Sequence, residues 1–518
     1  MKKIIYLLFL SLVFTFTSCI DESFTDCKRQ EPDTRAATGN ASAINQQLGR
    51  GINIGDTFEN GIYSGSWDSG YFQHIANYGF THVRIPIHWE TMVVPGTNTI
   101  NPTFMQHMKG VVDEALRCNL YVIINMHHHT LLMNNPSQYI DRFLSQWRQI
   151  AVAFQSYPDK LLFEILNEPG NAITPDLWNQ GLSMVYPIIR ESNLNRIVLI
   201  GTPYGGGVSG LNRLQLPAND GKIIVTVHYY NPFYFTHQGA NWVGEISNEW
   251  IGTQWRDTKA ERMSVDWDVK LIKAFSIRNN VPIHIGEFGA YEKADMESRI
   301  RWTTYVARRF EQHGFSWAYW ELYSGFGIYD RRNGVIRQGL LDALTSNQIP
   351  SPTALTTIPV YHSDFSSNQD GWYLLVNRNA GAEASLTYNS GKVSVNVSRA
   401  GTAPSHVQLV RIDTRNRIPT LVKGKQYMVT FKAYSSPLNG AGGSHSNRYY
   451  QSYVGQNYSP WKAYSTIKAF AIGEEEEELG YMFPMQENTD NNCRLYFDLG
   501  VEPGVFTLTD FKLDIVEL

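Results

Sequence analysis

Short apolar runs alternate with longer amphipathic stretches between residue 49 and residue 345. Each run has the length of a buried strand, and stretches such as 104–117 and 139–154 repeat apolar residues at the spacing of a helix. Strands that alternate with helices in this way predict an α/β fold, the (β/α)8 TIM barrel. The expected strands are 51–55, 80–86, 120–127, 161–167, 196–201, 222–228, 281–287 and 315–320.

A different pattern follows the segment 345–353, which is rich in proline and serine and ends the helical periodicity. Polar and apolar residues then alternate at period two, as in 392–397 and 426–431, and 505–513 reads as a closing strand. Many short strands favour an all-β sandwich of the jelly-roll type. We therefore expect a barrel domain at 46–347, a linker at 348–358 and a β-sandwich domain at 359–518.

The first 18 residues have the pattern of an export signal, with Lys2 and Lys3 before an apolar run. The run ends in small residues before Cys19, as at the lipid-attachment site of bacterial lipoproteins, and residues 19–45 read as a flexible polar tether. We expect a lipid anchor on Cys19 that holds the protein at the outer membrane or cell surface of a Gram-negative bacterium. An ordinary secretory peptide is the alternative.

Charge is mixed evenly along the chain. The 44 basic and 48 acidic residues leave a net charge of −4, without the basic stripe that binds nucleic acid. We therefore expect no nucleic-acid partner. Aromatic residues make up 13% of the chain, but they fill cores as readily as they stack on sugars, so the proportion alone identifies no partner.

Side chains with catalytic potential stand at the ends of the predicted strands. Because the carboxyl ends of barrel strands share one face, these residues should converge there. One such residue alone could be an ordinary polar group at a strand end, but that explanation is poor for the whole set. The set contains Arg84, His127, His128, Asn167, Glu168, His228, Tyr230, Glu287 and Trp320.

Two of these residues, Glu168 and Glu287, suit the cleavage of a glycosidic bond. That reaction needs a proton for the leaving oxygen and a nucleophile or base at the anomeric carbon. We expect Arg84 and Tyr230 to keep Glu287 ionised, and the charge of Glu287 to raise the pKa of Glu168, which favours the acid role.

The neighbouring residues support the same chemistry. Asn167 could donate to the sugar 2-hydroxyl, and Trp320 offers a stacking platform for the sugar before the scissile bond. No step needs a metal or another cofactor. The triplet 127–129 resembles a metal site, but successive strand residues point to opposite faces, so these histidines should not bind one ion together.

Residues 49–345 resemble glycoside hydrolase family 5, closest to bacterial endo-β-1,4-glucanases that also cut mannans. The resemblance implies that Glu168 is the acid/base and Glu287 the nucleophile. It also implies that His127, His128, Asn167, His228, Tyr230, His237, Trp242 and Trp320 line the glycone side. The matching motifs are Arg84, 125–127, 167–169, 228–233, 235–239, Trp242, 287–289, Trp320 and 324–327.

The segment 51–59 matches the first strand of that family, which adds Asp56 and Glu59 to the expected substrate contacts. Asp56 stands where the family usually has Asn. It could accept a hydrogen bond from a sugar hydroxyl, or it could bind a local arginine or backbone N–H and never meet the sugar.

The predicted sandwich resembles carbohydrate-binding modules, notably at 421–427 and in the closing strand. An aromatic cluster could form a sugar-stacking surface or could belong to the core and the domain interface; its members are Tyr449, Tyr450, Tyr453, Tyr458, Trp461 and Tyr464. The acidic run 474–478 is most simply a solvated loop, with calcium binding as the alternative.

These observations predict a retaining endo-β-1,4-glycanase, an enzyme that hydrolyses internal bonds of β-glucan polysaccharides and accepts glucomannan as a further substrate. A β-mannanase or a xyloglucan-specific endoglucanase is an alternative, because the same core residues serve those substrates. A third alternative, a surface lipoprotein that binds glycans without cleaving them, is disfavoured by the presence of Glu168, Glu287, Arg84 and Tyr230 together.

Overall fold

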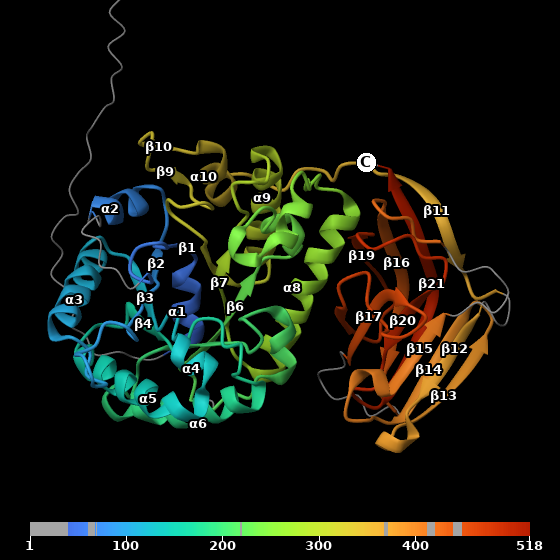
Figure 1. Cartoon of the computed structure of the whole chain (residues 1–518), viewed down its shortest axis with the longest axis horizontal. Coiled ribbons are helices and arrows are strands. Elements are labelled where there is room, and N and C mark those ends of the chain that lie inside the picture. The colour runs from blue at the N-terminus through green and yellow to red at the C-terminus, as the bar shows by residue number, and fades with distance from the viewer. Residues whose placement is uncertain are drawn as a thin grey trace, which may run out of the picture.

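The computed structural model describes residues 40–60, 68, 70–217, 220–366, 371–411, 420–438 and 448–517. The expected signal peptide, Cys19 and most of the expected tether lie outside the described residues. Two domains stand side by side, a barrel of mixed helices and strands and an all-β domain (Figure 1). Within the described residues, no helix combines the length and the hydropathy that crossing a membrane requires.

Eight parallel strands close the barrel in sequential order, with β8 paired to β1. Nearly every strand position is buried, because the barrel interior covers one face and the helices cover the other. The predicted TIM barrel is confirmed, with strands a few residues shorter than the apolar runs. The strands are β1 (Arg50–Asn53), β2 (His82–Ile85), β3 (Tyr121–Asn125), β4 (Leu161–Glu164), β5 (Val198–Gly201), β6 (Ile223–Tyr229), β7 (Ile283–Phe288) and β8 (Ser316–Tyr319).

The helices between the strands begin at recognisable caps. The Asn101 side chain accepts from backbone N–H groups of the first turn of α3, and Thr258 forms a capping box with Glu261 at α8. The helices are α2 (Gly70–Asn77), α3 (Pro102–Arg117), α4 (Thr130–Asn134), α5 (Pro136–Ala153), α6 (Pro175–Ser192), α7 (Phe233–Thr236), α8 (Lys259–Asn279), α9 (Met296–Gln312) and α10 (Gln338–Thr345). A short hairpin, β9 (Tyr329–Asp330) and β10 (Val335–Ile336), precedes α10.

The expected tether is too long at its C-terminal end. Helix α1 (Ala41–Leu48) begins inside it, capped by Asn40, whose side chain accepts from the backbone N–H of Ala43. Ile44 and Leu48 are four residues apart and lie on one helix face, where both are buried against the barrel. A single helical turn of apolar residues was too short a signal to separate from a polar tether.

The all-β domain packs two antiparallel sheets around one apolar core, which confirms the expected sandwich. One sheet runs β13-β14-β21-β16-β19, with β11 also on β21, and the other runs β12-β15-β20-β17-β18. The strands are β11 (Thr356–Ser363), β12 (Trp372–Val376), β13 (Glu383–Asn389), β14 (Lys392–Arg399), β15 (Val407–Arg411), β16 (Gln426–Ser436), β17 (Arg448–Gln456), β18 (Lys468–Ile472), β19 (Glu477–Pro484), β20 (Cys493–Asp498) and β21 (Gly504–Glu517).

Helix α8 of the barrel lies against β18 and β19 of the sandwich. Trp267 on this helix is only 3% exposed and joins the apolar core of the sandwich, where its ring contacts Phe470. A residue of one domain that completes the core of the other fixes their relative position, because burying a tryptophan contributes several kcal/mol (about 3–5 on truncation).

The acidic run is not simply a solvated loop, which corrects the sequence-based expectation. Glu477 and Glu478 begin β19 and pair with Lys270 and Lys259 of α8, at 2.8 Å and 3.1 Å. The local pattern of five glutamates carries no information about lysines more than 200 positions earlier.

Candidate active site

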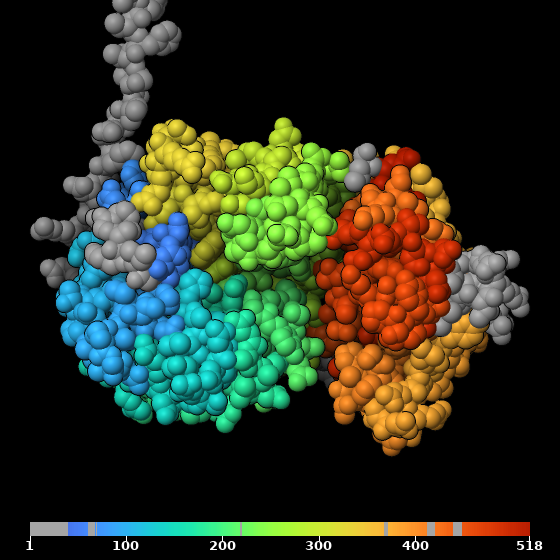
Figure 2. Space-filling view, in the orientation of Figure 1, coloured from blue at the N-terminus to red at the C-terminus, as the bar shows by residue number. Residues whose placement is uncertain are grey.

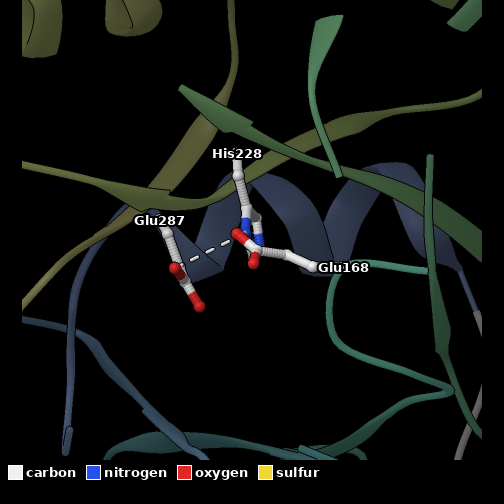
Figure 3. Close-up of side chains that lie close together, drawn as sticks. All are labelled: Glu168, His228 and Glu287. Carbon is white, nitrogen blue, oxygen red and sulfur yellow. Dashed lines mark hydrogen bonds and ion pairs between the residues drawn. The ribbon is translucent and has the colours of Figure 1, made fainter. Parts of the chain in front are cut away.

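The two predicted catalytic glutamates meet at the carboxyl end of the barrel. Glu168 follows β4, Glu287 lies near the end of β7, and His228 on β6 stands between them (Figure 3). Each of the three contributes a side-chain oxygen or nitrogen, and these atoms all lie within 4.8 Å of one another. Glu287 is 5% exposed, whereas the side chain of Glu168 is 39% exposed and reaches the open cleft.

Arg84 on β2 is the cationic centre of the site and is fully buried. Its Nη1 donates to Glu287 Oε1 at 2.7 Å and to Asn53 Oδ1 at 2.9 Å. Its Nε and Nη2 donate to the two oxygens of Glu164 at 2.6 Å and 2.7 Å, and Nη2 also donates to Asn167 Oδ1 at 2.8 Å. One guanidinium therefore orients the expected nucleophile and leaves the Asn167 amide N–H groups for a ligand.

Two of these partners were missed in the sequence. Glu164 is a carboxylate inside the apolar run 161–167, and Asn53 interrupts the apolar run 51–55. A charged or amide side chain within a buried strand is itself a signal, because burial without a partner is costly. Asn53 also donates to the backbone oxygen of Gly286 at 2.9 Å, which holds β1 against β7 next to Glu287.

Two further side chains bind the glutamates. The Tyr230 hydroxyl donates to Glu287 Oε2 at 3.0 Å, as expected. His228 Nδ1 lies 2.8 Å from Glu168 Oε1 and 3.4 Å from Glu287 Oε2. Both carboxylates thus have one oxygen within reach of the same imidazole.

The pKa directions of the two glutamates in the unliganded site are the reverse of those expected. Burial would raise the pKa of Glu168, but the hydrogen bond and charge of His228, together with the charges of Arg84 and His128, lower it. Burial raises the pKa of Glu287, and the charge of Glu168 adds to it, against the lowering effect of His228 and Arg84. The contact of His228 with Glu168, which no local sequence pattern indicates, contributes to the lowered pKa of Glu168, whereas burial is the main cause of the raised pKa of Glu287.

His228 in turn carries positive charge more readily than a free histidine. Burial would lower its pKa, but the two carboxylates raise it. The group Glu168, His228 and Glu287 is spaced closely enough to hold a metal ion. Both carboxylates already have protein partners, since Arg84 donates to Glu287 and His228 contacts Glu168.

A cleft of ≈ 620 Å³ opens above Glu287 and collects most of the expected substrate contacts. His127 is 3% exposed, and its ring stacks against Trp320 with centroids 5.9 Å apart and planes 7° apart. The Asn125 amide nitrogen lies 3.0 Å from His127 Nδ1. Burial keeps the pKa of His127 well below the usual value, so its imidazole is neutral. The predicted residues lining this cleft are Asp56, Glu59, His127, His128, Asn167, Glu168, Tyr230, His237, Trp242, Glu287 and Trp320.

Only one of the three consecutive histidines points away from the cleft, because β3 ends at Asn125 and the strand alternation expected for the triplet does not extend to it. His127 and exposed His128 face the cleft, whereas His129 is fully buried on the other side, where it lies 3.1 Å from Glu90 and 3.2 Å from Gln146. No two-sided arrangement of this kind can surround a single ion.

His237 and Trp242 come from the segment after β6. His237 stacks on Phe233 with centroids 4.0 Å apart, and burial lowers its pKa to about 4, so it is neutral near pH 7. Trp242 is 58% exposed and is held edge-on by Tyr291. An exposed tryptophan supported from behind presents a flat apolar face to the cleft, as a sugar ring requires.

Glu59 lines the cleft as expected, and its carboxylate is also bound to the local backbone. It is 4% exposed, and its carboxylate accepts from the backbone N–H groups of Thr57 and Asp56, so it holds the turn after β1. Burial raises its pKa to about 7. Asp56 is exposed at the rim of the cleft, where its Oδ1 accepts from the Asn60 side chain at 2.5 Å. Among the described residues the side-chain partner of Asp56 is an amide rather than an arginine or a backbone group, and a sugar hydroxyl could donate to the second oxygen.

Part of the aromatic cluster at 449–464 packs in the core or at the domain interface, and part is exposed as a sugar-stacking surface would be. Tyr450 is 2% exposed and belongs to the core, and the Tyr449 ring lies under Arg278 of the barrel. Tyr458 and Trp461 are 41% and 53% exposed. Only these two retain the exposure that a stacking surface needs.

Comparison with known proteins agrees with this site. Residues 51–325 match the family model described as cellulase (glycosyl hydrolase family 5), and residues 360–504 match one described as a carbohydrate binding domain. Endoglucanase H of Acetivibrio thermocellus is 32% identical over 313 residues, which cover 58% of this chain and 33% of that protein. The chain therefore spans about a third of the length of this relative.

Solved structures give the same result. The structure of endoglucanase Cel5A from the hyperthermophilic Thermotoga maritima is 43% identical, with a TM-score of 0.57, and the match covers 59% of this chain and 99% of that one. A structure of Cel5A with mannotriose is 42% identical at the same TM-score and the same coverage. Because the cellulase model matches a little over half of the chain, this protein belongs to the cellulase family, glycosyl hydrolase family 5.

Proposed function

We propose that the protein is a retaining endo-β-1,4-glucanase in which Glu287 is the nucleophile and Glu168 the acid/base. The observation that carries this proposal is the separation of the two carboxylates, which bring oxygens within 4.8 Å of each other. Retaining glycosidases place these groups about 5–5.5 Å apart, whereas inverting enzymes leave about 6.5–9.5 Å for a water molecule.

The first step forms a bond between Glu287 and the anomeric carbon while the bond to the leaving oxygen breaks. Glu168 gives its proton to that oxygen, so the leaving chain departs as a neutral alcohol. Arg84 and Tyr230 each occupy one oxygen of Glu287 and keep it oriented. In the second step Glu168 takes a proton from water, which attacks the same carbon and frees Glu287.

The proton on Glu168 depends on bound substrate. In the open site His228 lowers the pKa of Glu168. A sugar chain that covers the exposed side of Glu168 removes water from it, and desolvation raises a carboxyl pKa. Once Glu287 is esterified its negative charge is gone, so the pKa of Glu168 falls again and the group can act as the base.

The proposed substrate is a β-1,4-linked glucan backbone. The cleft contains Trp320 and Trp242 as apolar faces and neutral His127 and His237 as hydrogen-bonding groups, which suits an uncharged polysaccharide. Several relatives are named endoglucanases, and a solved Cel5A holds mannotriose. Glucomannan is therefore the second substrate to test, beside xyloglucan.

Two variants test the roles of the glutamates. Glu287→Ala should abolish turnover and recover part of it with azide, giving the α-glycosyl azide, because azide replaces the missing nucleophile. Glu168→Ala should lose about 10²–10⁴-fold on polysaccharide and much less on aryl glycosides, whose leaving groups need no proton. Glu292→Ala is the control, since this exposed glutamate lines the same cleft away from the pair. Full activity of either catalytic variant would refute the assignment, and product release from polysaccharide excludes a purely binding role.

We also propose that the protein is anchored by lipid on Cys19 and that the sandwich binds polysaccharide through Tyr458 and Trp461. The charged and apolar leader before Cys19 supports the anchor. The Cys19→Ala protein should leave the membrane fraction and appear in the soluble one.

A Tyr458→Ala/Trp461→Ala protein should bind insoluble glucan more weakly in a pull-down while its hydrolysis of short oligosaccharides is unchanged. Membrane association or glucan binding equal to wild type would reject the corresponding proposal.

A further inference from the structure

A second hollow of ≈ 440 Å³ continues from the active site toward the sandwich domain. It shares Glu168, Tyr230, His237 and Trp242 with the first cleft. The space-filling view shows the molecular surface hollowed between the barrel and the sandwich (Figure 2). The substrate groove is therefore not confined to the barrel.

The two walls of this hollow come from different domains. Gly205, Gly207, Val208 and Ser209, which follow β5, line it on the barrel side. The segment 466–469 at the start of β18 lines it on the sandwich side, with Ile467 49% exposed. An exposed isoleucine beside hydroxyl-bearing Thr466 and Ser209 matches the alternation of C–H faces and hydroxyls on a sugar chain.

The sandwich wall is fixed rather than loosely apposed. Lys468 is 7% exposed and forms a buried ion pair with Asp268 of α8, with its Nζ 2.7 Å and 2.8 Å from the two carboxylate oxygens. Asp268 Oδ2 also accepts from the Tyr229 hydroxyl and from Asn231 Nδ2, both at 3.0 Å. Tyr229 and Asn231 flank Tyr230, so the contact between the domains extends to the residue that orients the nucleophile.

The residues that line the second hollow indicate on which side of the scissile bond it lies. His237 and Trp242, which the family resemblance placed on the glycone side, border both hollows and so lie where the two sides meet. Glu168 also lines the second hollow, but Glu287 and Trp320 do not. The acid must face the leaving oxygen, and the nucleophile lies on the glycone side. The space that extends from Glu168 away from Glu287 is therefore the space into which the leaving chain projects.

We propose that residues 466–469 of the sandwich domain form part of a leaving-group subsite, so that both domains hold one β-1,4-linked chain across the cleavage point. This inference rests on the proposed glycanase function. It assigns the sandwich a role inside the catalytic groove, separate from any binding of a distant part of the polysaccharide.

Comparison of two substrates tests the proposal. 4-Nitrophenyl β-cellobioside places one aryl ring beyond Glu168, whereas cellohexaose places several glucose units there. In the full-length protein, Ile467→Ala should lower kcat/KM about fivefold more for cellohexaose than for the aryl substrate, because apolar contact with the leaving chain is lost. Ile358→Ala is the matched control, an isoleucine of similar exposure, 45%, on β11 outside both clefts.

Each outcome has one meaning. The ratio to follow is kcat/KM for cellohexaose divided by kcat/KM for 4-nitrophenyl β-cellobioside. A fall in this ratio for Ile467→Ala and not for Ile358→Ala supports the shared subsite. Unchanged kcat/KM values for both substrates overturn it, because Ile467 then makes no contact with the chain, and an equal fold loss on both substrates also overturns it, because the residue then has only a structural role. If the wild-type protein hydrolyses neither substrate nor β-glucan, the proposed function itself is refuted, which is a different result from an active enzyme with an unchanged ratio.

Discussion

His228 influences the ionisation of both glutamates of the proposed catalytic pair, Glu168 and Glu287. It is 5% exposed, contacts Glu168 at 2.8 Å and Glu287 at 3.4 Å, and has a raised pKa. A cation in that position stabilises the state in which both carboxylates are ionised. The pair titrates as a unit, so both macroscopic pKa values respond to it.

Replacement of His228 by asparagine should therefore move both limbs of the pH profile of kcat/KM to higher pH, because each carboxylate loses a stabilising charge. The expected shift is about one pH unit. It is measured with 4-nitrophenyl β-cellobioside, with His362→Asn in the sandwich as control. Limbs that superimpose on those of the wild type, or move to lower pH, would contradict this role for His228.

Glu59 has a pKa raised to about 7 by burial, well above that of an unfolded glutamate. The folded state therefore holds this proton more tightly, and stability should fall as the pH rises from about 4.5 to 7. Glu59→Gln cannot ionise, so it should flatten this part of the stability curve, by about 2–3 kcal/mol. Urea unfolding at pH 5 and pH 8 measures the slope. Glu292→Gln is the exposed control, and parallel curves for Glu59→Gln and wild type would reject the prediction.

At the scale of elements, the turn after β5 approaches the catalytic pair closely. Gly206 has φ of +75°, and a Cβ there would lie 3.3 Å from Glu168 Cγ and 3.3 Å from His228 Cγ. Its backbone N–H donates to Thr202, and its carbonyl accepts from the His228 N–H at 2.8 Å. Because Gly206 has no side chain, this turn can approach Glu168 and His228 without steric overlap.

Gly206→Ala should consequently lower kcat by about tenfold or more, because a small displacement of Glu168 disturbs proton transfer. Gly314→Ala isolates the backbone cost, since Gly314 has the same φ of +75° and its added Cβ meets nothing within 4 Å. Both variants should lose about 1 kcal/mol of stability. Equal kcat values for the two variants would show that contact with Glu168 is unimportant.

At the scale of the whole molecule, the domains depend on each other. Trp267 fills the sandwich core, and Asp268 keeps its buried charge balanced through Lys468. A barrel without the sandwich would expose the tryptophan and leave Asp268 unpaired. We therefore expect a protein ended after residue 348 to be much less stable than the full chain, even though the barrel contains the catalytic residues.

Lys468→Met tests this dependence with the chain intact. It should cost about 3–5 kcal/mol, since the buried Asp268 loses its cation. Lys259→Met is the matched control, because its pair with Glu478 has side chains 70% and 45% exposed and should cost less than about 1 kcal/mol. The double variant Lys468→Met/Asp268→Asn should recover part of the loss in urea unfolding. A small effect of Lys468→Met, equal to that of Lys259→Met, would contradict the structural role.

The sequence alone was sufficient for the architecture and for bringing the proposed catalytic pair to one face of the barrel. Strand and helix periodicities are local, so apolar runs such as 161–167 predict β4, and the direction of parallel strands then brings Glu168, Glu287 and Arg84 to one face.

Tertiary structure decided what depends on distance between remote residues. The contact of His228 with Glu168 lowers the pKa of Glu168, contrary to expectation, and Glu477 and Glu478 pair with lysines of α8. None of these partners lies at a fixed sequence spacing from its mate. Side-chain contacts across strands and domains arise only after the backbone is closed and packed, and local periodicity carries no record of them.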